Sequence, residues 1–311
     1  MKLTWIEDDN TTTVIYENIK SVTAGNGGEV NLPTCYINIT ECGEIFVNKT
    51  ITKYPEEYPE VSTGGYYRPK NCKSRHKVAV LVPYRDRKKD LFVYLHNIHP
   101  FLIRQKLEYR IFVIEQKGTD VFNRGKLFNA GFVEIKKYGK WRCVIFHDVD
   151  LLPLDDRILY SCPTWPKHMC ATVAEVKKPK FRSLFGGVSS MDVQQFQQVN
   201  GYSNLYWGWG GEDNDLFWRI RAAGLPIVRN RKDIARYTTL KHSVQSPNRL
   251  RFALLSSTYQ RYKREGISNL KYKLESVTEH HLHTHIIVDI NPGKENTTKL
   301  ISQWIKSRYL E

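Results

Sequence analysis

The sequence has no run of about 18 or more apolar residues, and its first 30 residues lack the apolar core of a signal peptide. A membrane-spanning helix and a secretion signal each require such a run, so we expect the chain as written to carry no membrane anchor. Its six cysteines include no C-x-x-C pair, which argues against a cysteine-based zinc site. Internal repeats and low-complexity tracts are also absent, so the composition is that of a globular protein.

Acidic residues are scarce relative to basic ones: 32 Asp and Glu stand against 47 Lys and Arg, which gives a net charge of +15. Such an excess favours anionic partners, including nucleic acid, anionic lipid and phosphorylated substrates. The basic residues are scattered, apart from clusters at residues 85–89 and 177–182. Because there is neither a basic stripe nor a nucleic-acid-binding motif, we expect no nucleic-acid partner.

A chain of 311 residues with 41% hydrophobic content suits one large α/β domain or two small ones. Four glycosylation sequons begin at Asn10, Asn38, Asn48 and Asn296. They indicate a secretory route, in which an even number of cysteines favours disulfides. The cysteine spacing alone does not define which residues pair.

Three short apolar runs have the length and composition of strands buried on both faces: residues 77–82, 110–114 and 144–146. Helices are expected between them at residues 90–97, with an interruption near Pro100, and at residues 122–137. This order predicts an α/β fold with a doubly wound, mostly parallel sheet flanked by helices. Later helices are expected at residues 191–199, 216–223 and 249–264.

Residues 206–215, Tyr-Trp-Gly-Trp-Gly-Gly-Glu-Asp-Asn-Asp, alternate glycines with indoles before three carboxylates. The glycines can take φ values that other residues avoid, which predicts a bendable loop. The two tryptophans are large plates suited to stacking on a sugar ring, and acids are favoured in a first helical turn. This combination is typical of a binding lid that carries a candidate base. The alternative is a tight turn with two core tryptophans and an acidic cap.

The triplet Asp148-Val149-Asp150 directly follows the third predicted strand, where a doubly wound sheet binds ligands. In an extended segment, residues two apart point the same way, so the two carboxylates would converge on one hard cation. The alternative is a solvated acidic loop.

Arg85 and Arg87 follow the first predicted strand and suit a phosphate or a uracil edge, although they also suit plain surface charge. Phe122-Asn123-Arg124 opens a predicted helix, where backbone donors and an arginine fork suit an anion. The alternative there is an ordinary capped helix start.

Four of the ten histidines cluster near the C-terminus: His280, His281, His283 and His285. The last three would share one face of a strand. No carboxylate or cysteine joins them at ligand spacing, so we do not expect a metal site there. His242 stands alone after a basic run, and a lone histidine is more often structural than a ligand.

Five motifs together resemble the β-1,4-galactosyltransferase family of animal Golgi enzymes (glycosyltransferase family 7), most closely its invertebrate β-1,4-N-acetylgalactosaminyltransferases. They occur in the family's order between residues 35 and 289, at residues 82–87, 122–126, 148–150, 185–189 and 207–213. The resemblance implies a GT-A fold, an inverting single displacement and a UDP-sugar donor held through Mn²⁺.

The resemblance also implies a role for each matching residue. The residues implied in donor binding are Pro83, Tyr84, Arg85, Arg87, Phe122, Arg124, Asp148, Val149, Leu184 and Trp209. The residues implied in acceptor binding are Trp209, Gly210, Gly211, Asp213, Asn214 and Arg249. Asp213 matches the catalytic base, with Glu212 beside it, and metal ligation falls on Asp150, His242 and the poorer ligand Thr239. The implied disulfides are Cys35–Cys72 and Cys143–Cys162.

Three positions depart from the family pattern. Leu184 stands where vertebrate galactosyltransferases carry a tyrosine beside the sugar's C2 group, and we expect the smaller, apolar side chain to leave room for a 2-acetamido group. The alternative is that Leu184 is a packed core residue. Asn214 replaces an aspartate among the acceptor-binding acids, and an amide donates as well as accepts hydrogen bonds. Thr239 replaces a methionine ligand, and a hydroxyl suits hard metals better than soft ones.

We therefore expect transfer of GalNAc from UDP-GalNAc, in β-1,4 linkage, to terminal GlcNAc of glycoprotein or glycolipid glycans. One alternative is a galactosyltransferase that uses UDP-Gal. Another, from a different class, is an inactive sugar-binding protein on the same fold, which Thr239 and Asn214 would permit. The retained metal ligands and base favour an enzyme.

The resemblance divides the chain into a stem-like segment (residues 1–34), a GT-A catalytic domain (35–293) and a C-terminal tail (294–311). Family members are anchored in the Golgi by an N-terminal helix. We expect this chain to be a truncated form of such a protein, with its site in the Golgi lumen.

Overall fold

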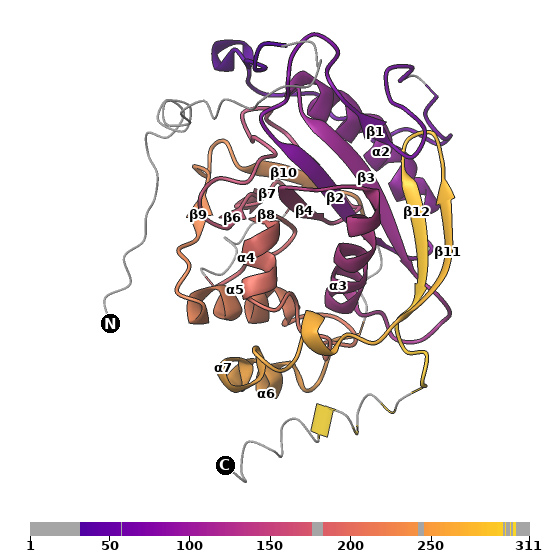
Figure 1. Ribbon diagram of the computed structural model, residues 1–311, viewed down its shortest axis with the longest axis vertical. Helices are drawn as coiled ribbons and strands as arrows, with labels where there is room; N and C mark the ends of the chain where they lie inside the picture. The colour runs from indigo at the N-terminus through magenta and orange to yellow at the C-terminus, as the bar shows by residue number, and fades with distance from the viewer. Residues whose placement is uncertain are drawn as a thin grey trace, which may run out of the picture.

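The computed structural model describes residues 32–56, 58–175, 183–241, 246–294, 296, 299 and 301–302. Within these residues the chain forms one large sheet with helices on both faces and a small three-stranded sheet beside it (Figure 1). Of the helices in this part of the chain, none is long and apolar enough to cross a membrane.

Four parallel strands form the centre of the large sheet. In spatial order they are β12 (Thr284–Asp289), β3 (Glu108–Gln116), β2 (Lys77–Tyr84) and β4 (Cys143–His147). The helices α2 (Lys88–Arg104) and α3 (Arg124–Ile135) connect β2 to β3 and β3 to β4. The predicted alternation of strand and helix is confirmed, and each predicted strand extends by one or two residues in at least one direction.

Antiparallel pairs flank this parallel centre, so the whole sheet is mixed. The pairs join β11 (Lys273–Glu279) to β12, β1 (Tyr66–Tyr67) to β3, β8 (Val188–Asp192) to β4, and β6 (Lys167–His168) to β8. A last short strand, β9 (Val228–Arg229), runs parallel to β6. The small sheet contains β5 (Leu151–Pro153), β10 (Arg236–Thr239) and β7 (Thr172–Val173).

Strand β2 divides the interior into two cores because it is buried on both faces. Val78, Val80 and Val82 face one core, which α2 covers, whereas Ala79 and Leu81 face the other. The alternation follows from the two-residue period of a strand. The second core is covered by α3, α4 (Val193–Gln198) and α5 (Glu212–Ala222), which lie on one face of the sheet in Figure 1.

Helix α2 continues through Pro100, so the predicted interruption there is wrong. A proline has no N–H, and the carbonyl of His96, four residues earlier, loses its helical donor. The hydroxyl of Tyr58 donates to that carbonyl at 2.6 Å. A side chain from a distant loop thus satisfies the acceptor that Pro100 leaves open, and the helix continues to Arg104.

The single helix expected at residues 249–264 is two short helices, α6 (Arg251–Ser256) and α7 (Thr258–Arg261). At the break, the hydroxyls of Ser257 and Thr258 donate to carbonyls three residues earlier, at 2.9 and 3.0 Å. Such side-chain bonds compete with the helical pattern and explain why the helix divides.

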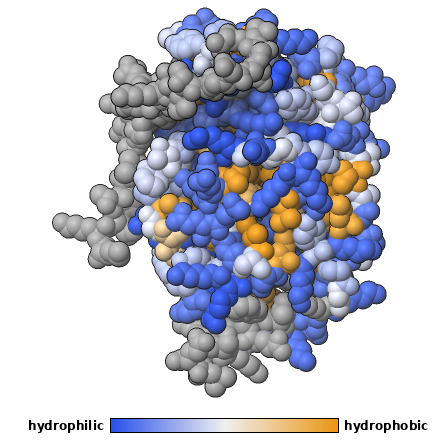
Figure 2. Space-filling model, in the orientation of Figure 1, coloured by the Kyte–Doolittle hydropathy of each residue, from blue (hydrophilic) through white to orange (hydrophobic). Residues whose placement is uncertain are grey.

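Both implied disulfides, Cys35–Cys72 and Cys143–Cys162, are present. The second ties the start of β4 to the loop before β6. On the face seen in Figure 2, hydrophilic residues dominate the surface, and apolar residues gather near the middle of the view. The predominance of polar surface agrees with the basic composition of the chain.

Candidate active site

A pocket of about 230 Å³ opens at the carboxyl ends of β2 and β4. Its lining consists of Pro83, Arg85, Arg87, Phe122, Arg124, Asp148, Val149, Asp150, Gly208, Trp209, Glu212 and Asp213. All of these except Gly208 were candidate residues from the sequence. The pocket therefore brings together segments that lie as far apart along the chain as Pro83 and Asp213.

Two strand ends and two helix starts meet at this pocket. Parallel strands end on the same edge of a sheet, so the segments after β2 and β4 are neighbours. Helix α3 begins there with Arg124, and the side chain of Asn123 caps it by accepting a hydrogen bond from the Lys126 N–H at 2.9 Å. Helix α5 begins there with Glu212 and Asp213.

Arg124 joins the two acidic segments of the pocket. Its Nε donates to Asp148 Oδ1 at 2.6 Å, its Nη1 donates to Asp213 Oδ1 at 2.6 Å, and Glu212 Oε1 lies 3.6 Å from Nη1. Its Nη2 is buried without a hydrogen-bond partner in the described structure. An arginine with one unsatisfied buried donor is suited to receive a further acceptor, such as a phosphate oxygen.

A second arginine holds the other carboxylate of the acidic triplet. Arg87 Nη1 donates to Asp150 Oδ2 at 2.7 Å. Arg85 is differently engaged, because it lies over the Phe122 ring at 5.2 Å and donates to the Asp120 carbonyl at 2.5 Å. Asp148 and Asp150 thus share the pocket but pair with different arginines.

The pocket holds more negative charge than its arginines compensate. Burial raises the pKa of Asp148 to about 6, with Asp150 and Asp213 raising it further and Arg124 opposing them. Burial also raises the pKa of Glu212 to about 7, with a further rise from Asp213 and an opposing effect of Arg124. Glu212 Oε2 is buried and has no hydrogen-bond partner among the described residues. An added cation would be favoured in this pocket.

Gly186, which is not among the candidate residues from the sequence, positions Asp213. A Cβ built on Gly186 would lie 1.8 Å from Asp213 Oδ2, so only glycine lets this carboxylate rest on the backbone. The sequence could have indicated that Gly186 matters for the site, because this residue belongs to one of the five motifs. We infer from the contact that this motif provides space for Asp213.

The two tryptophans of the glycine-rich loop have different environments. Trp209 is 55% exposed and lines the pocket, whereas Trp207 is 8% exposed and belongs to the second core. The interpretation of both as stacking plates is wrong for Trp207, which is the core tryptophan of the plainer alternative. Gly208 and Gly210 have φ of 86° and 95°, as expected for a loop that only glycine can form.

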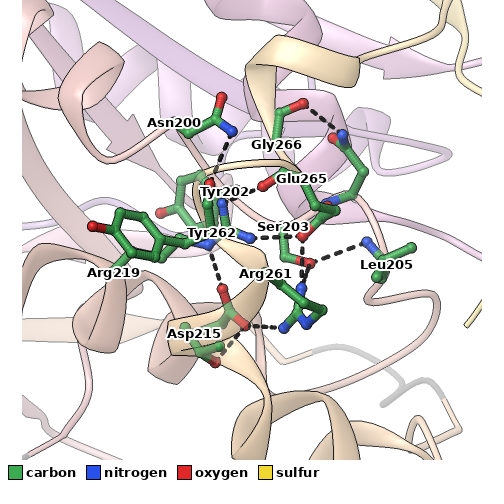
Figure 3. Close-up of polar contacts among 12 residues, drawn as sticks. Asn200, Tyr202, Ser203, Leu205, Asp215, Arg219, Arg261, Tyr262, Glu265 and Gly266 are labelled. Carbon is green, nitrogen blue, oxygen red and sulfur yellow. Dashed lines mark hydrogen bonds and ion pairs between the residues drawn. The ribbon is translucent and has the colours of Figure 1, made fainter. Parts of the chain in front are cut away.

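A buried ionic network lies behind the start of α5 (Figure 3). Arg219 donates to Asp215 at 2.5 Å and to Glu265 at 2.7 Å, and Arg261 donates to the same two carboxylates at 2.6 Å each. All four side chains are at most 2% exposed. Asp215 lies two residues after Asp213, so this network fixes the turn of α5 that carries the candidate base.

Leu184 and Asn214 do not line the pocket in the described structure, but Asn214 contacts Ser183, the residue that precedes Leu184. The Asn214 amide donates to the Ser183 carbonyl at 2.6 Å, and Arg229 donates to the Leu184 carbonyl at 3.0 Å. An aspartate at residue 214 would have no hydrogen for this bond. The asparagine therefore fixes the segment that carries Leu184, which itself is half-buried.

The other candidates lie around the pocket rather than in its wall. Tyr84, Gly210, Gly211 and Arg249 are not among the lining residues of the described structure. Thr239 pairs with Leu151 across the small sheet, next to the point where the Leu240 N–H donates to the Asp150 carbonyl at 2.9 Å. His242 lies outside the described residues.

Comparison with known proteins identifies relatives for most of the chain. Residues 36–163 match the N-terminal region of glycosyl transferase group 7, and residues 167–243 match the N-terminal domain of galactosyltransferase. Beta-1,4-galactosyltransferase 4 of Cricetulus griseus is 42% identical over 248 residues, which are 78% of this chain and 72% of that protein. Beta-1,4-galactosyltransferase 1 of Mus musculus is 42% identical over 236 residues, which are 75% of this chain and 59% of that protein.

A solved structure is similar in fold. A mutant of Drosophila β-1,4-galactosyltransferase 7, in complex with manganese, UDP-Gal and xylobiose, is 29% identical to this chain, with a TM-score of 0.61. The match covers 74% of this chain and 98% of that one.

Proposed function

Since the chain belongs to glycosyl transferase group 7, we propose that it transfers GalNAc from UDP-GalNAc, in β-1,4 linkage, to a terminal GlcNAc of a glycan. Its fold is GT-A, and it is a UDP-sugar-dependent β-1,4-hexosyltransferase that uses Mn²⁺. The identity of the donor, the identity of the acceptor and the role of each residue are what we propose.

The observation that carries the proposal is the joining of Asp148 and Asp213 by Arg124 in one pocket. An acceptor hydroxyl is a poor nucleophile, and a positioned carboxylate takes its proton as the new bond forms at the anomeric carbon. Asp213 is the proposed base. The departing UDP gathers negative charge, and we expect the guanidinium groups of Arg87 and Arg124, which line the pocket, to stabilise it.

The pocket fits a manganese ion because it is rich in carboxylate oxygens and short of positive charge. Asp150 would hold the ion together with His242, and Thr239 is a further proposed ligand. When bound, the ion stabilises the charge that develops on the diphosphate. Arg87 pairs with Asp150, so its guanidinium lies beside the carboxylate that would hold the ion and would be available to the diphosphate.

Leu184 is the basis for choosing UDP-GalNAc. Its side chain is smaller than tyrosine and has no hydroxyl, so it leaves volume beside the C2 substituent for an acetamido group. The Asn214 contact to Ser183 supports a fixed position for this segment. Enlarging a pocket admits the larger donor more readily than it excludes the smaller one.

UDP-Gal is the alternative donor. The relatives are named galactosyltransferases, and the similar solved structure contains UDP-Gal. For localisation we propose the Golgi lumen, because the two disulfides suit an oxidising compartment and the family works there.

The test is sugar transfer to a GlcNAc-terminated acceptor with Mn²⁺, run with UDP-GalNAc and UDP-Gal side by side. We expect faster transfer from UDP-GalNAc and a product with a β-1,4 bond by NMR. Asp213→Asn should retain donor binding and lose at least 100-fold in turnover. Donor binding without any turnover in the unmodified protein would instead support the inactive sugar-binding protein.

A further inference from the structure

Three histidines converge at the edge of the sheet, and none of them lines the pocket in the described structure. His280 follows β11, and His283 and His285 lie before and in β12. One ring nitrogen of each lies within 4.8 Å of the others. The His280 and His283 rings are stacked, with centroids 4.7 Å apart, and the His285 ring lies 6.0 and 5.9 Å from them. We call these three residues the histidine cluster.

Residues from other parts of the chain orient the histidine cluster. Glu115 on the adjacent strand β3 accepts a hydrogen bond from His285 Nε2 at 2.7 Å, which leaves Nδ1 with the lone pair. The Tyr54 hydroxyl lies 3.5 Å from His283 Nδ1. A carboxylate that holds the second nitrogen of an imidazole is the usual support of a histidine metal ligand. Glu115 is the carboxylate whose absence from the local sequence argued against a metal site.

We propose that the histidine cluster binds one divalent ion of the imidazole-preferring class, Zn²⁺ in the first instance, at a site separate from the carboxylate pocket. Tetrahedral zinc with bonds of about 2.0–2.1 Å needs its nitrogens about 3.4 Å apart, so the cluster must contract by roughly 1.5 Å. His280 is exposed and next to a bend, so it can move, whereas His283 is buried and provides a fixed ligand.

The two sites differ in the metal they select. Imidazole ligands bind Zn²⁺, Cu²⁺ and Ni²⁺ well, and affinity for divalent metals at a given site is lowest for Mn²⁺. The carboxylate pocket suits Mn²⁺ through its oxygen ligands. Excess Mn²⁺ therefore fills the pocket and leaves the histidine cluster available for zinc.

A zinc ion there would fasten the β11–β12 hairpin to the body of the sheet. His285 is linked to β3 through Glu115, and its ring meets the edge of Tyr84 at the end of β2, with centroids 6.0 Å apart. The ion would join the turn at His280 to this group. We thus expect zinc to raise the melting temperature even when Mn²⁺ is saturating.

The experiment titrates the metal-stripped full chain with Zn²⁺ against a chromophoric chelator, in the presence of excess Mn²⁺. The expected result is one zinc per chain. His280→Gln should weaken zinc binding at least 10-fold, and His280→Gln with His285→Gln should abolish it. Glu115→Gln should weaken it about 10- to 100-fold, as removal of such a supporting carboxylate does.

The matched control is His281→Gln. His281 is adjacent in sequence, but its Nε2 contacts the Val61 carbonyl at 3.0 Å, outside the cluster. The His281→Gln variant should bind zinc as tightly as the unmodified chain. Circular dichroism should show that each variant is folded. The proposal is overturned by no zinc uptake under excess Mn²⁺, by full affinity in His280→Gln, or by equal losses in His280→Gln and His281→Gln.

Discussion

Replacing Arg261 by methionine should lower the free energy of unfolding by about 4 kcal/mol, within the range of roughly 3–5 kcal/mol for breaking a buried ion pair. The network contains two arginines and two carboxylates, and is formally neutral. Without Arg261, Asp215 and Glu265 share the single guanidinium of Arg219. Although burial alone raises the pKa of Asp215, Arg219 and Arg261 together hold it below its usual value. Removing Arg261 therefore leaves a negative charge without compensation in a dry interior.

The magnitude has a second component, because Arg261 also donates to the Ser257 hydroxyl at 2.9 Å and the Leu254 carbonyl at 3.0 Å. Methionine fills much of the same volume, so the loss reports charge and hydrogen bonding more than a cavity. For a chain of this size, about 4 kcal/mol corresponds to a melting temperature lower by roughly 6 °C.

The assay is chemical denaturation with the disulfides intact, followed by tryptophan fluorescence. The matched control is Lys263→Met, an exposed cation two residues away, which should change stability by no more than about 0.5 kcal/mol. Adding Glu265→Gln to Arg261→Met restores neutrality, so the double variant should lose about 1–3 kcal/mol less than the sum of the two single losses. A loss below about 1 kcal/mol for Arg261→Met, or strict additivity in the double variant, would show that Arg261 does not compensate a buried negative charge.

Three further predictions concern the pocket. Gly186→Ala places a methyl group against the Asp213 carboxylate and should lower kcat about 100-fold or more, with donor binding retained; an unchanged kcat would show that this contact does not position the base. Asn214→Asp removes the donor to the Ser183 carbonyl and should raise KM for UDP-GalNAc severalfold with little change in melting temperature, whereas an unchanged KM would separate Asn214 from donor binding. Because the folded protein raises the pKa of Glu212 from 4.5 to about 7, it binds more protons than the unfolded chain between these values, and its stability falls as the pH rises through that window. Glu212→Gln should flatten this fall by at most about 3 kcal/mol in denaturation at pH 5 and pH 8, and an equal slope in both proteins would contradict the assignment.

The sequence was sufficient to predict the parallel centre of the sheet and most of the pocket. The apolar runs that form β2, β3 and β4 are buried on both faces. In a chain of this composition, such runs are compatible with few structures other than buried strands. The residues that follow β2 and β4 then meet by topology alone.

Features that depend on contacts between distant residues were not predictable. Trp207 and Trp209 look alike in sequence, and only the packing of the folded chain separates the core residue from the pocket residue. The helix through Pro100 depends on the Tyr58 hydroxyl. Likewise, Glu115 reaches the histidine cluster only through the pairing of β12 with β3.

The proposed donor preference is measured by the ratio of kcat/KM for UDP-GalNAc to that for UDP-Gal, in the unmodified protein and in Leu184→Tyr. We expect a ratio above one in the unmodified protein and a shift of at least about 10-fold towards UDP-Gal in Leu184→Tyr, equivalent to about 1.4 kcal/mol. Leu184→Val, which keeps a small apolar side chain, should retain the preference for UDP-GalNAc. A preference for UDP-Gal in the unmodified protein, or a ratio that Leu184→Tyr does not change, would contradict the proposal that Leu184 sets the donor.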